Sequence, residues 1–217
     1  MSLALAADRK GTGMENLVTV TIRSTHYYLI DTGQGMFMVD TGWAGALPEL
    51  QRELKRMDLS LSDIRYVMIT HSHPDHAGLT QEIKQAASAR LVILESQIPL
   101  LQNLRVFYKG KDIYKPITVD PGDLVLGRDN RADLKKIGML GEIVETPGHS
   151  DDSVSLVLDS GSAFTGDLHP PDFVEEGARD ITCQSWKTLV DRGAKTIYPA
   201  HANPFPIDPI AALVADC

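Results

Sequence analysis

The chain has 217 residues, of which 43% are hydrophobic and 23% charged, values typical of a globular protein with a substantial core. The 21 basic and 29 acidic residues give a formal net charge of −8, and no basic run exceeds two residues. Nucleic acids and anionic membranes need basic patches on their partners, so we expect neither as a partner.

The first residues of the chain and its two cysteines indicate in which cellular compartment the protein is expected. The opening MSLALAADRK has a short apolar run but lacks the basic leader and the length of a signal sequence. No apolar stretch approaches membrane-spanning length. Cys183 and Cys217 show neither metal-ligand nor redox spacing, so we expect two free thiols in a reducing compartment. The sequence therefore predicts a soluble, cytoplasmic protein, and it leaves the oligomeric state open.

The first part of the chain alternates strand and helix patterns. Strands are expected at 16–23, 26–31 and 35–40, with the hairpin turn DTGQG between the last two. Residues 45–57 space their leucines at helical intervals, and 64–70 form a short β-branched run typical of a buried strand.

A second helix is expected over 77–89, followed by a strand over 90–95, so the order resembles a βαβ unit. Residues 96–122 mix a short helix with aromatics, lysines and prolines, a composition that indicates a cap or a long surface excursion. Beyond them, strands are expected at 123–127, 141–148, 152–159, 162–167 and 195–201, and helices at 182–193 and 208–215. No linker or repeat divides the chain, which predicts one α/β domain over residues 1–217 built from two similar halves.

Three of the seven histidines fall within ITHSHPDHAG, residues 69–78. Residues two apart in an extended segment face the same way, so His71 and His73 can bind one ion. Pro74 then bends the chain, and the following loop can present Asp75 and His76 to a neighbouring position. A closed structural zinc site would normally contain cysteines, and none lies nearby. The cluster therefore favours a catalytic metal site.

Three more metal-competent side chains follow apolar strands. His149 stands in ETPGHSDD, Asp167 in AFTGDLH and His201 in IYPAHANP. A strand end can hold a ligand rigidly. Each of the three is also compatible with an ordinary turn residue, but together they complete the ligands for two ions.

THSHPDHAG resembles the HxHxDH signature of the metallo-β-lactamase-fold superfamily, and TPGHS, TGD and PAH follow in that family's order. The resemblance implies a four-layer αββα sandwich with a dinuclear site at one edge. By it, His71, His73 and His149 bind one divalent ion, and Asp75, His76 and His201 bind the second. Asp167 bridges the two ions, which are expected to be zinc, with manganese or iron as alternatives.

The resemblance also implies a metal-dependent hydrolase. A water shared by two cations loses a proton near neutral pH, and the hydroxide attacks an ester, thioester, lactone or phosphoester of a small molecule. Asp75 is expected to act as a catalytic residue by orienting this water and moving a proton. His169 is either a second catalytic residue or an exposed loop histidine. Asp40 either accepts a hydrogen bond from a liganding imidazole or caps a turn.

Other roles stay open at this stage. His26 is expected to be a structural strand residue, and Trp43, Phe107, Tyr108 and Tyr114 either line a pocket or pack in the core. Asp167 stands where well-known β-lactamases have cysteine, and Pro170 where lactonases have tyrosine, which disfavours both activities. Alternatives are a mononuclear iron persulfide dioxygenase, a β-lactam hydrolase and, last, a non-catalytic metal-stabilised binding protein. The chain ends soon after His201, so we expect neither the helical substrate domain of glyoxalase II nor a flavin-bearing domain.

Overall fold

A computed structural model describes residues 17–215 and residue 217. The expectation for residues 1–10 lies outside this range. Among the described residues, no helix combines the length and the apolar character needed to cross a membrane.

The first half of the chain forms a six-stranded sheet in the order β1-β2-β3-β4-β5-β6. Its strands are β1 (Leu17–Ile22), β2 (Thr25–Asp31), β3 (Met36–Val39), β4 (Ile64–Met68), β5 (Arg90–Leu94) and β6 (Leu124–Leu126). β1, β2 and β3 pair antiparallel, whereas β3, β4, β5 and β6 pair parallel. The β2–β3 turn is closed by Asp31, whose carboxylate accepts a hydrogen bond from the backbone N–H of Gly33.

Helices connect the parallel strands of this sheet. They are α1 (Leu47–Arg56), α2 (Pro74–Ala77), α3 (Thr80–Ala87) and α4 (Gln102–Phe107), with 3-10 turns η1 (Leu61–Asp63) and η2 (Glu95–Leu101). Leu50 and Leu54 are fully buried, as the helical spacing of leucines in α1 predicts.

The second half forms a five-stranded sheet in the order β11-β10-β9-β8-β7. Its strands are β7 (Gly141–Glu145), β8 (Val154–Leu158), β9 (Ser162–Gly166), β10 (Thr196–Pro199) and β11 (Phe205–Pro206). β9 and β10 run parallel, and the other pairs are antiparallel. The accompanying helices are α5 (Arg131–Lys136), η3 (Pro171–Phe173), α6 (Glu176–Asp191) and α7 (Asp208–Ala215).

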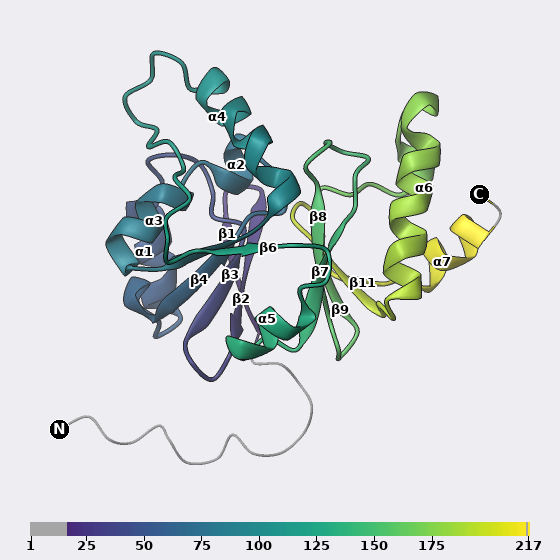
Figure 1. The fold of residues 1–217 in the computed structure, drawn as a ribbon, viewed down its shortest axis with the longest axis horizontal. Coiled ribbons are helices and arrows are strands. Elements are labelled where there is room, and N and C mark those ends of the chain that lie inside the picture. The colour runs from purple at the N-terminus through teal and green to yellow at the C-terminus, as the bar shows by residue number, and fades with distance from the viewer. Residues whose placement is uncertain (1–16, 216) are drawn as a thin grey trace.

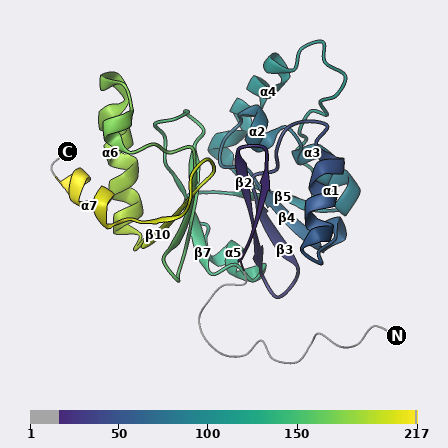
Figure 2. The ribbon, with the colours of Figure 1, turned by 180° about the vertical axis from the view of Figure 1, so that it is seen from behind.

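Three apolar cores separate four layers (Figures 1 and 2). One core lies between the first sheet and the helices α1 and α3, one lies between the two sheets, and one lies between the second sheet and α6 with α7. Phe37 and Phe164 bury their rings between the sheets, and Trp186 of α6 buries its indole against the second sheet. The predicted four-layer αββα sandwich is confirmed.

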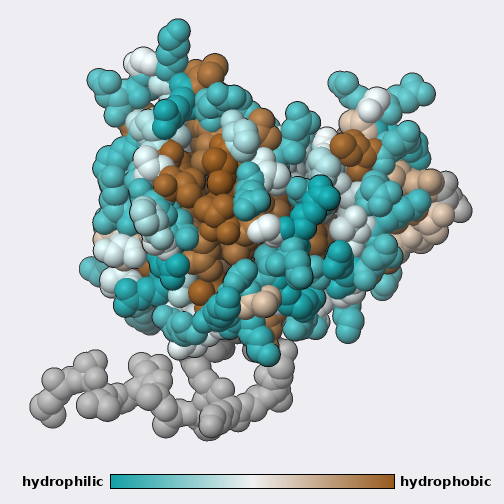
Figure 3. Space-filling model, viewed as in Figure 1, coloured by the Kyte–Doolittle hydropathy of each residue, from teal (hydrophilic) through white to brown (hydrophobic). Residues whose placement is uncertain are grey.

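Some details differ from the sequence-based expectation. α6 begins at Glu176, six residues before the predicted start. Residues 175–181 are mostly exposed and carry no apolar period, so the pattern of apolar residues did not reveal the first part of this helix. α5 was not predicted. Residues 96–122 contain most of η2, α4 and an irregular loop, as the expected short helix and surface excursion require, and α4 lies above α2 in Figure 1. Apolar side chains gather below α4 on the face shown in Figure 3. Ile98, Leu101, Ile117 and Val119 line a pocket of about 470 Å³.

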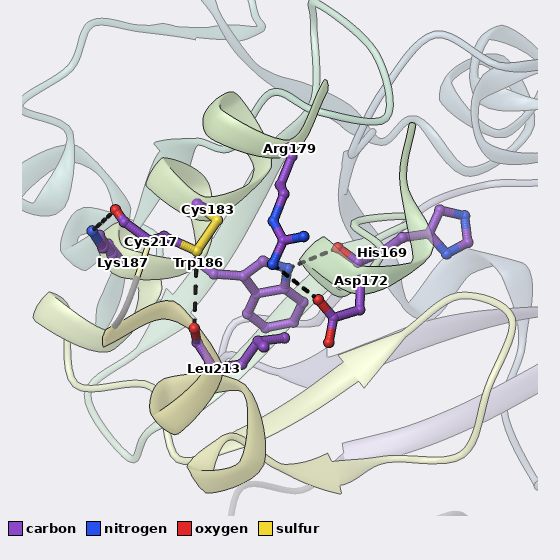
Figure 4. Close-up of a disulfide and its surroundings, with 8 residues drawn as sticks. All are labelled: His169, Asp172, Arg179, Cys183, Trp186, Lys187, Leu213 and Cys217. Atoms are coloured by element: carbon purple, nitrogen blue, oxygen red, sulfur yellow. Dashed lines mark hydrogen bonds and ion pairs between the residues drawn. A yellow bond between two sulfur atoms is a disulfide. The ribbon is translucent and has the colours of Figure 1, made fainter. Parts of the chain in front are cut away.

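The two cysteines form a disulfide, so the expectation of two free thiols is wrong. α7 packs on the same core as α6 through Ile210 and Val214, and this packing returns the chain end to α6. The Cα atoms of Cys183 and Cys217 are therefore 6.1 Å apart although 34 positions separate them (Figure 4). Spacing along the sequence cannot reveal such a meeting, because it depends on the packing of two helices.

Candidate metal centre

The seven candidate ligands lie at one edge of the two sheets. His71 and His73 follow β4, and α2 carries Asp75 and His76. The other three follow strand ends of the second sheet: His149 comes after β7, Asp167 directly after β9 and His201 after β10. Because these strands all point their carboxyl ends at this edge, residues up to 130 positions apart meet there.

Gly166 allows the close approach of the two halves. Its φ of +56° lies in the left-handed region, and a Cβ atom there would lie 2.4 Å from the hydroxyl of Thr70. Thr70 directly precedes His71, so only a glycine at position 166 lets the end of β9 bring Asp167 beside the histidine cluster.

The candidate ligand atoms form two adjoining groups. One contains His71, His73, His149 and Asp167, and the other contains Asp75, His76 and His201, with the ligand atoms of each group within 4.8 Å of one another. In the first group, Nε2 of His149 lies 3.0 Å from Nδ1 of His73. In the second, Nε2 of His201 lies 3.2 Å from Oδ2 of Asp75.

Asp167 lies between these groups. Its Oδ2 is 3.3 Å from Nε2 of His76 and 3.5 Å from Nε2 of His149, and its Oδ1 is 3.4 Å from Nε2 of His201. Oδ2 is also 3.9 Å from Nε2 of His71. One carboxylate thus contacts histidines of both groups, which is the position that a bridging ligand needs.

The donor atoms fit divalent cations. Nε2 of His71, Nε2 of His76 and Oδ1 of Asp167 are buried and have no hydrogen-bond partner among the described residues. Buried polar atoms are normally satisfied, so atoms left open and aimed at one place point to a ligand. Imidazole nitrogens and carboxylate oxygens without any thiolate suit zinc, manganese or iron.

Hydrogen bonds to Nδ1 hold the imidazole rings of His76 and His201 in place. Nδ1 of His76 lies 2.8 Å from Oδ2 of Asp40, which is 2% exposed, and Nδ1 of His201 donates to the backbone carbonyl of Ser24 over 2.8 Å. Thr70 donates its N–H and its hydroxyl to Asp40. Such partners leave Nε2 free as the ligand atom. Asp40 therefore takes the first of its two expected roles, contact with a site imidazole.

Carboxylates and imidazoles shift each other's pKa in this cluster. The nearby carboxylates of Asp167 and Asp75 raise the pKa of His201 to about 11. Burial alone would lower the pKa of His76, but the carboxylates of Asp40 and Asp167 outweigh burial and raise it to about 10. Burial lowers the pKa of His71 well below its usual value, so this ring is neutral near pH 7. A cation that binds Nε2 of His76 and Nε2 of His201 would displace the protons on these atoms.

The remaining sequence candidates lie around this cluster. The exposed His169 ring is centred 5.9 Å from the His149 ring, and its backbone carbonyl accepts a hydrogen bond from Nε1 of Trp186 (Figure 4). His26 contacts the hydroxyl of Thr21 across the β1–β2 pair at 2.8 Å, which agrees with a structural strand residue.

Three residues that support the candidate ligands were not predicted from the sequence. Thr70 holds Asp40, the carbonyl of Ser24 orients His201, and the hydroxyl of Thr25 donates to Oδ2 of Asp75 over 3.4 Å. Thr70 is adjacent to the histidine motif and its position was a usable signal. Ser24 lies in the β1–β2 turn and Thr25 begins β2, about 50 residues before Asp75, and neither carries a local signal.

Comparison with known proteins agrees with the fold described above. The family model described as the metallo-beta-lactamase superfamily matches residues 20–201. A beta-lactamase-like protein 2 homolog of Caenorhabditis elegans is 27% identical over 184 residues, 83% of this chain and 57% of that protein. An atrochrysone carboxyl ACP thioesterase of Claviceps purpurea is 28% identical over 193 residues, 83% of this chain and 52% of that protein. The chain thus spans little more than half the length of these two relatives.

A solved structure supports the fold. The crystal structure of a metallo-beta-lactamase family protein from Thermus thermophilus has a TM-score of 0.65 and 21% sequence identity, and it covers 93% of this chain and 78% of that one. At this identity the likeness concerns the fold.

Proposed function

The chain belongs to the metallo-β-lactamase superfamily, and from this premise we propose that it is a dinuclear metal-dependent hydrolase that cleaves a thioester of a small molecule. The observation that carries the proposal is the convergence of seven nitrogen and oxygen donors into two adjoining groups. Among the esters, thioesters, lactones and phosphoesters that such a site can serve, we choose the thioester because three similar proteins are named atrochrysone carboxyl ACP thioesterases.

In this proposal, His71, His73 and His149 would hold one cation and Asp75, His76 and His201 the other, and the Asp167 carboxylate would serve both. The cations, when bound, lower the pKa of a water and polarise the scissile carbonyl. Asp40 keeps the proton of His76 on Nδ1, so that Nε2 stays available. The Ser24 carbonyl does the same for His201.

Asp75 and His169 are the proposed catalytic residues. The Asp75 carboxylate sits between Thr25 and His201, where it can accept a proton of the attacking water. His169 lies on the loop after Asp167 with its ring exposed beside His149. From there it can protonate the departing thiolate as the carbon–sulfur bond breaks. The Trp186 hydrogen bond to its carbonyl holds this loop in place.

The experiment is a substrate panel on metal-free protein reconstituted with zinc, manganese or iron. Thioesters, lactones, phosphodiesters and β-lactams are compared at pH 7.5. We expect zinc- or manganese-dependent thioester hydrolysis that a chelator abolishes. Oxygen uptake on a persulfide by protein with one iron, without hydrolysis, would replace this proposal by the dioxygenase alternative.

A further inference from the structure

Residues 102–115, called here the basic tip, form a positively charged surface on an acidic protein. The basic tip contains Arg105, Lys109, Lys111 and Lys115 against one acidic residue, while the whole chain has a net charge of −8. All four basic side chains are exposed. None of them pairs with a carboxylate within the described part of the chain, so their charge is available to a ligand.

The basic tip packs directly on the elements that carry the metal ligands. The hydroxyl of Tyr108 lies 3.4 Å from the backbone N–H of Ala44, and a Cβ atom at Gly78 would come within 2.8 Å of the same hydroxyl. Gly78 ends α2, the helix of Asp75 and His76. Figure 1 shows α4 directly above α2. The basic tip therefore packs beside α2, the helix that carries two of the candidate ligands.

Aromatic contacts connect the metal centre with the cations. The backbone N–H groups of Thr41 and Gly42 donate to the carbonyl of His76, and the next residue, Trp43, has its ring centred 6.5 Å from that of Phe107. The ammonium of Lys111 lies 4.5 Å from the centre of the Phe107 ring. A cation held over an aromatic face has a restricted position, which suits recognition better than a freely moving side chain.

The other side of this edge has the opposite charge. The segment that leads into α6 carries Asp172, Glu175 and Glu176, and the nearby Arg179 already pairs with Asp172 at 3.2 Å. In Figure 1, α4 and α6 rise on opposite sides of the strand ends. An anionic substrate arm is therefore attracted to the α4 side and repelled from the α6 side.

We infer that the basic tip is a subsite for a phosphate group on the thiol portion of the substrate. The basic tip carries four basic residues and one acidic residue, a net charge opposite in sign to that of a phosphate monoester, which is close to a dianion at neutral pH. In the reaction, water adds its oxygen to the acyl carbon, the carbon–sulfur bond breaks, and the thiol leaves with its phosphate unchanged. The inference rests on the proposed function and specifies which thioesters that function serves.

The test uses two substrates that differ only in this phosphate, S-acetyl-4′-phosphopantetheine and S-acetylpantetheine. We expect the zinc-loaded wild-type protein to prefer the phosphate-bearing substrate, measured as the ratio of the two kcat/KM values. The double variant K109E/K111E should lower that ratio about tenfold, because each exposed charge contributes a small, salt-dependent part. The matched control K55E/K135E changes the net charge equally on α1 and α5, where it should leave the ratio unchanged.

The outcomes separate the inference from the proposed function. If both thioesters are hydrolysed and the ratio is near one, or K109E/K111E does not change it, the inference is overturned while the hydrolase proposal stands. If neither is hydrolysed, the amide analogues, with nitrogen in place of sulfur, are titrated calorimetrically into the zinc-loaded protein. Binding that requires the phosphate and is lost in K109E/K111E then supports the subsite, and equal binding of the two amides overturns it.

Discussion

Replacing Asp40 by Asn probes how the protein orients His76. In the wild-type protein, Oδ2 of Asp40 lies 2.8 Å from Nδ1 of His76, while Oδ1 accepts the N–H of Thr70 at 2.7 Å. An Asn side chain has one oxygen, and Thr70 needs it as an acceptor. The amide nitrogen then faces Nδ1 and moves the imidazole proton to Nε2, the atom that should bind the cation.

The expected effect is specific to one of the two groups. Loss of a carboxylate behind a metal-bound histidine lowers metal affinity about 10- to 100-fold, or about 1.4–2.7 kcal/mol. We expect D40N to weaken the group of Asp75, His76 and His201 by this factor and to leave the group of His71 nearly unchanged. The measurement is a competition titration of metal-free protein with zinc and a chromophoric chelator at pH 7.5.

A second aspartate with a buried side chain provides the control. The carboxylate of Asp123 pairs with Lys84 and accepts the backbone N–H of Leu91, so its partners lie outside the histidine cluster. D123N should lower stability without changing either zinc affinity. Equal zinc affinities in D40N and wild-type protein, or equal losses in D40N and D123N, would refute the orienting role of Asp40.

Three further substitutions and one titration test the metal ligands, the proposed acid and the disulfide. Asp167→Ala should abolish tight zinc binding at both groups, and plasma emission analysis should find less than one ion per chain; two retained ions would exclude a bridging role. Zinc binding at pH 8 should release about two protons, because the pKa values of about 10 and 11 keep His76 and His201 protonated in the metal-free protein. Zinc affinity should therefore rise with pH, and calorimetry in buffers of different ionisation enthalpy measures the release. His169→Ala should lower kcat about 100-fold for alkyl thioesters but little for aryl thioesters, whose thiolates leave without protonation; equal losses would argue against an acid role. Cys217→Ser should lower the free energy of unfolding by about 4 kcal/mol in urea titrations, as expected for a loop closed over 34 positions, and an unchanged midpoint would contradict a stabilising disulfide.

The residues that converge at the candidate metal centre could be recognised in the sequence where the signal is local. The motif around His71 and the strand ends before Asp167 and His201 were recognisable because a short apolar run followed by a ligand residue indicates a rigidly held donor. Helical and alternating periods likewise predicted most strands and the two helices α1 and α3 with small errors at their ends.

Features that depend on packing between distant elements were not predictable. The disulfide of Cys217 requires α7 to lie on α6, and the orienting carbonyl of Ser24 requires the β1–β2 turn to reach the end of β10. The basic tip was visible only as scattered lysines, because its charge becomes a surface when α4 and its loop fold over α2.

The central claim is that two cations held by the seven donors make this chain a hydrolase. The most direct measurement adds zinc stepwise to metal-free protein and follows thioester hydrolysis at each step. We predict that activity reaches its plateau at two zinc ions per chain. Full activity without added zinc, or hydrolysis that never exceeds the metal-free rate, would contradict the claim.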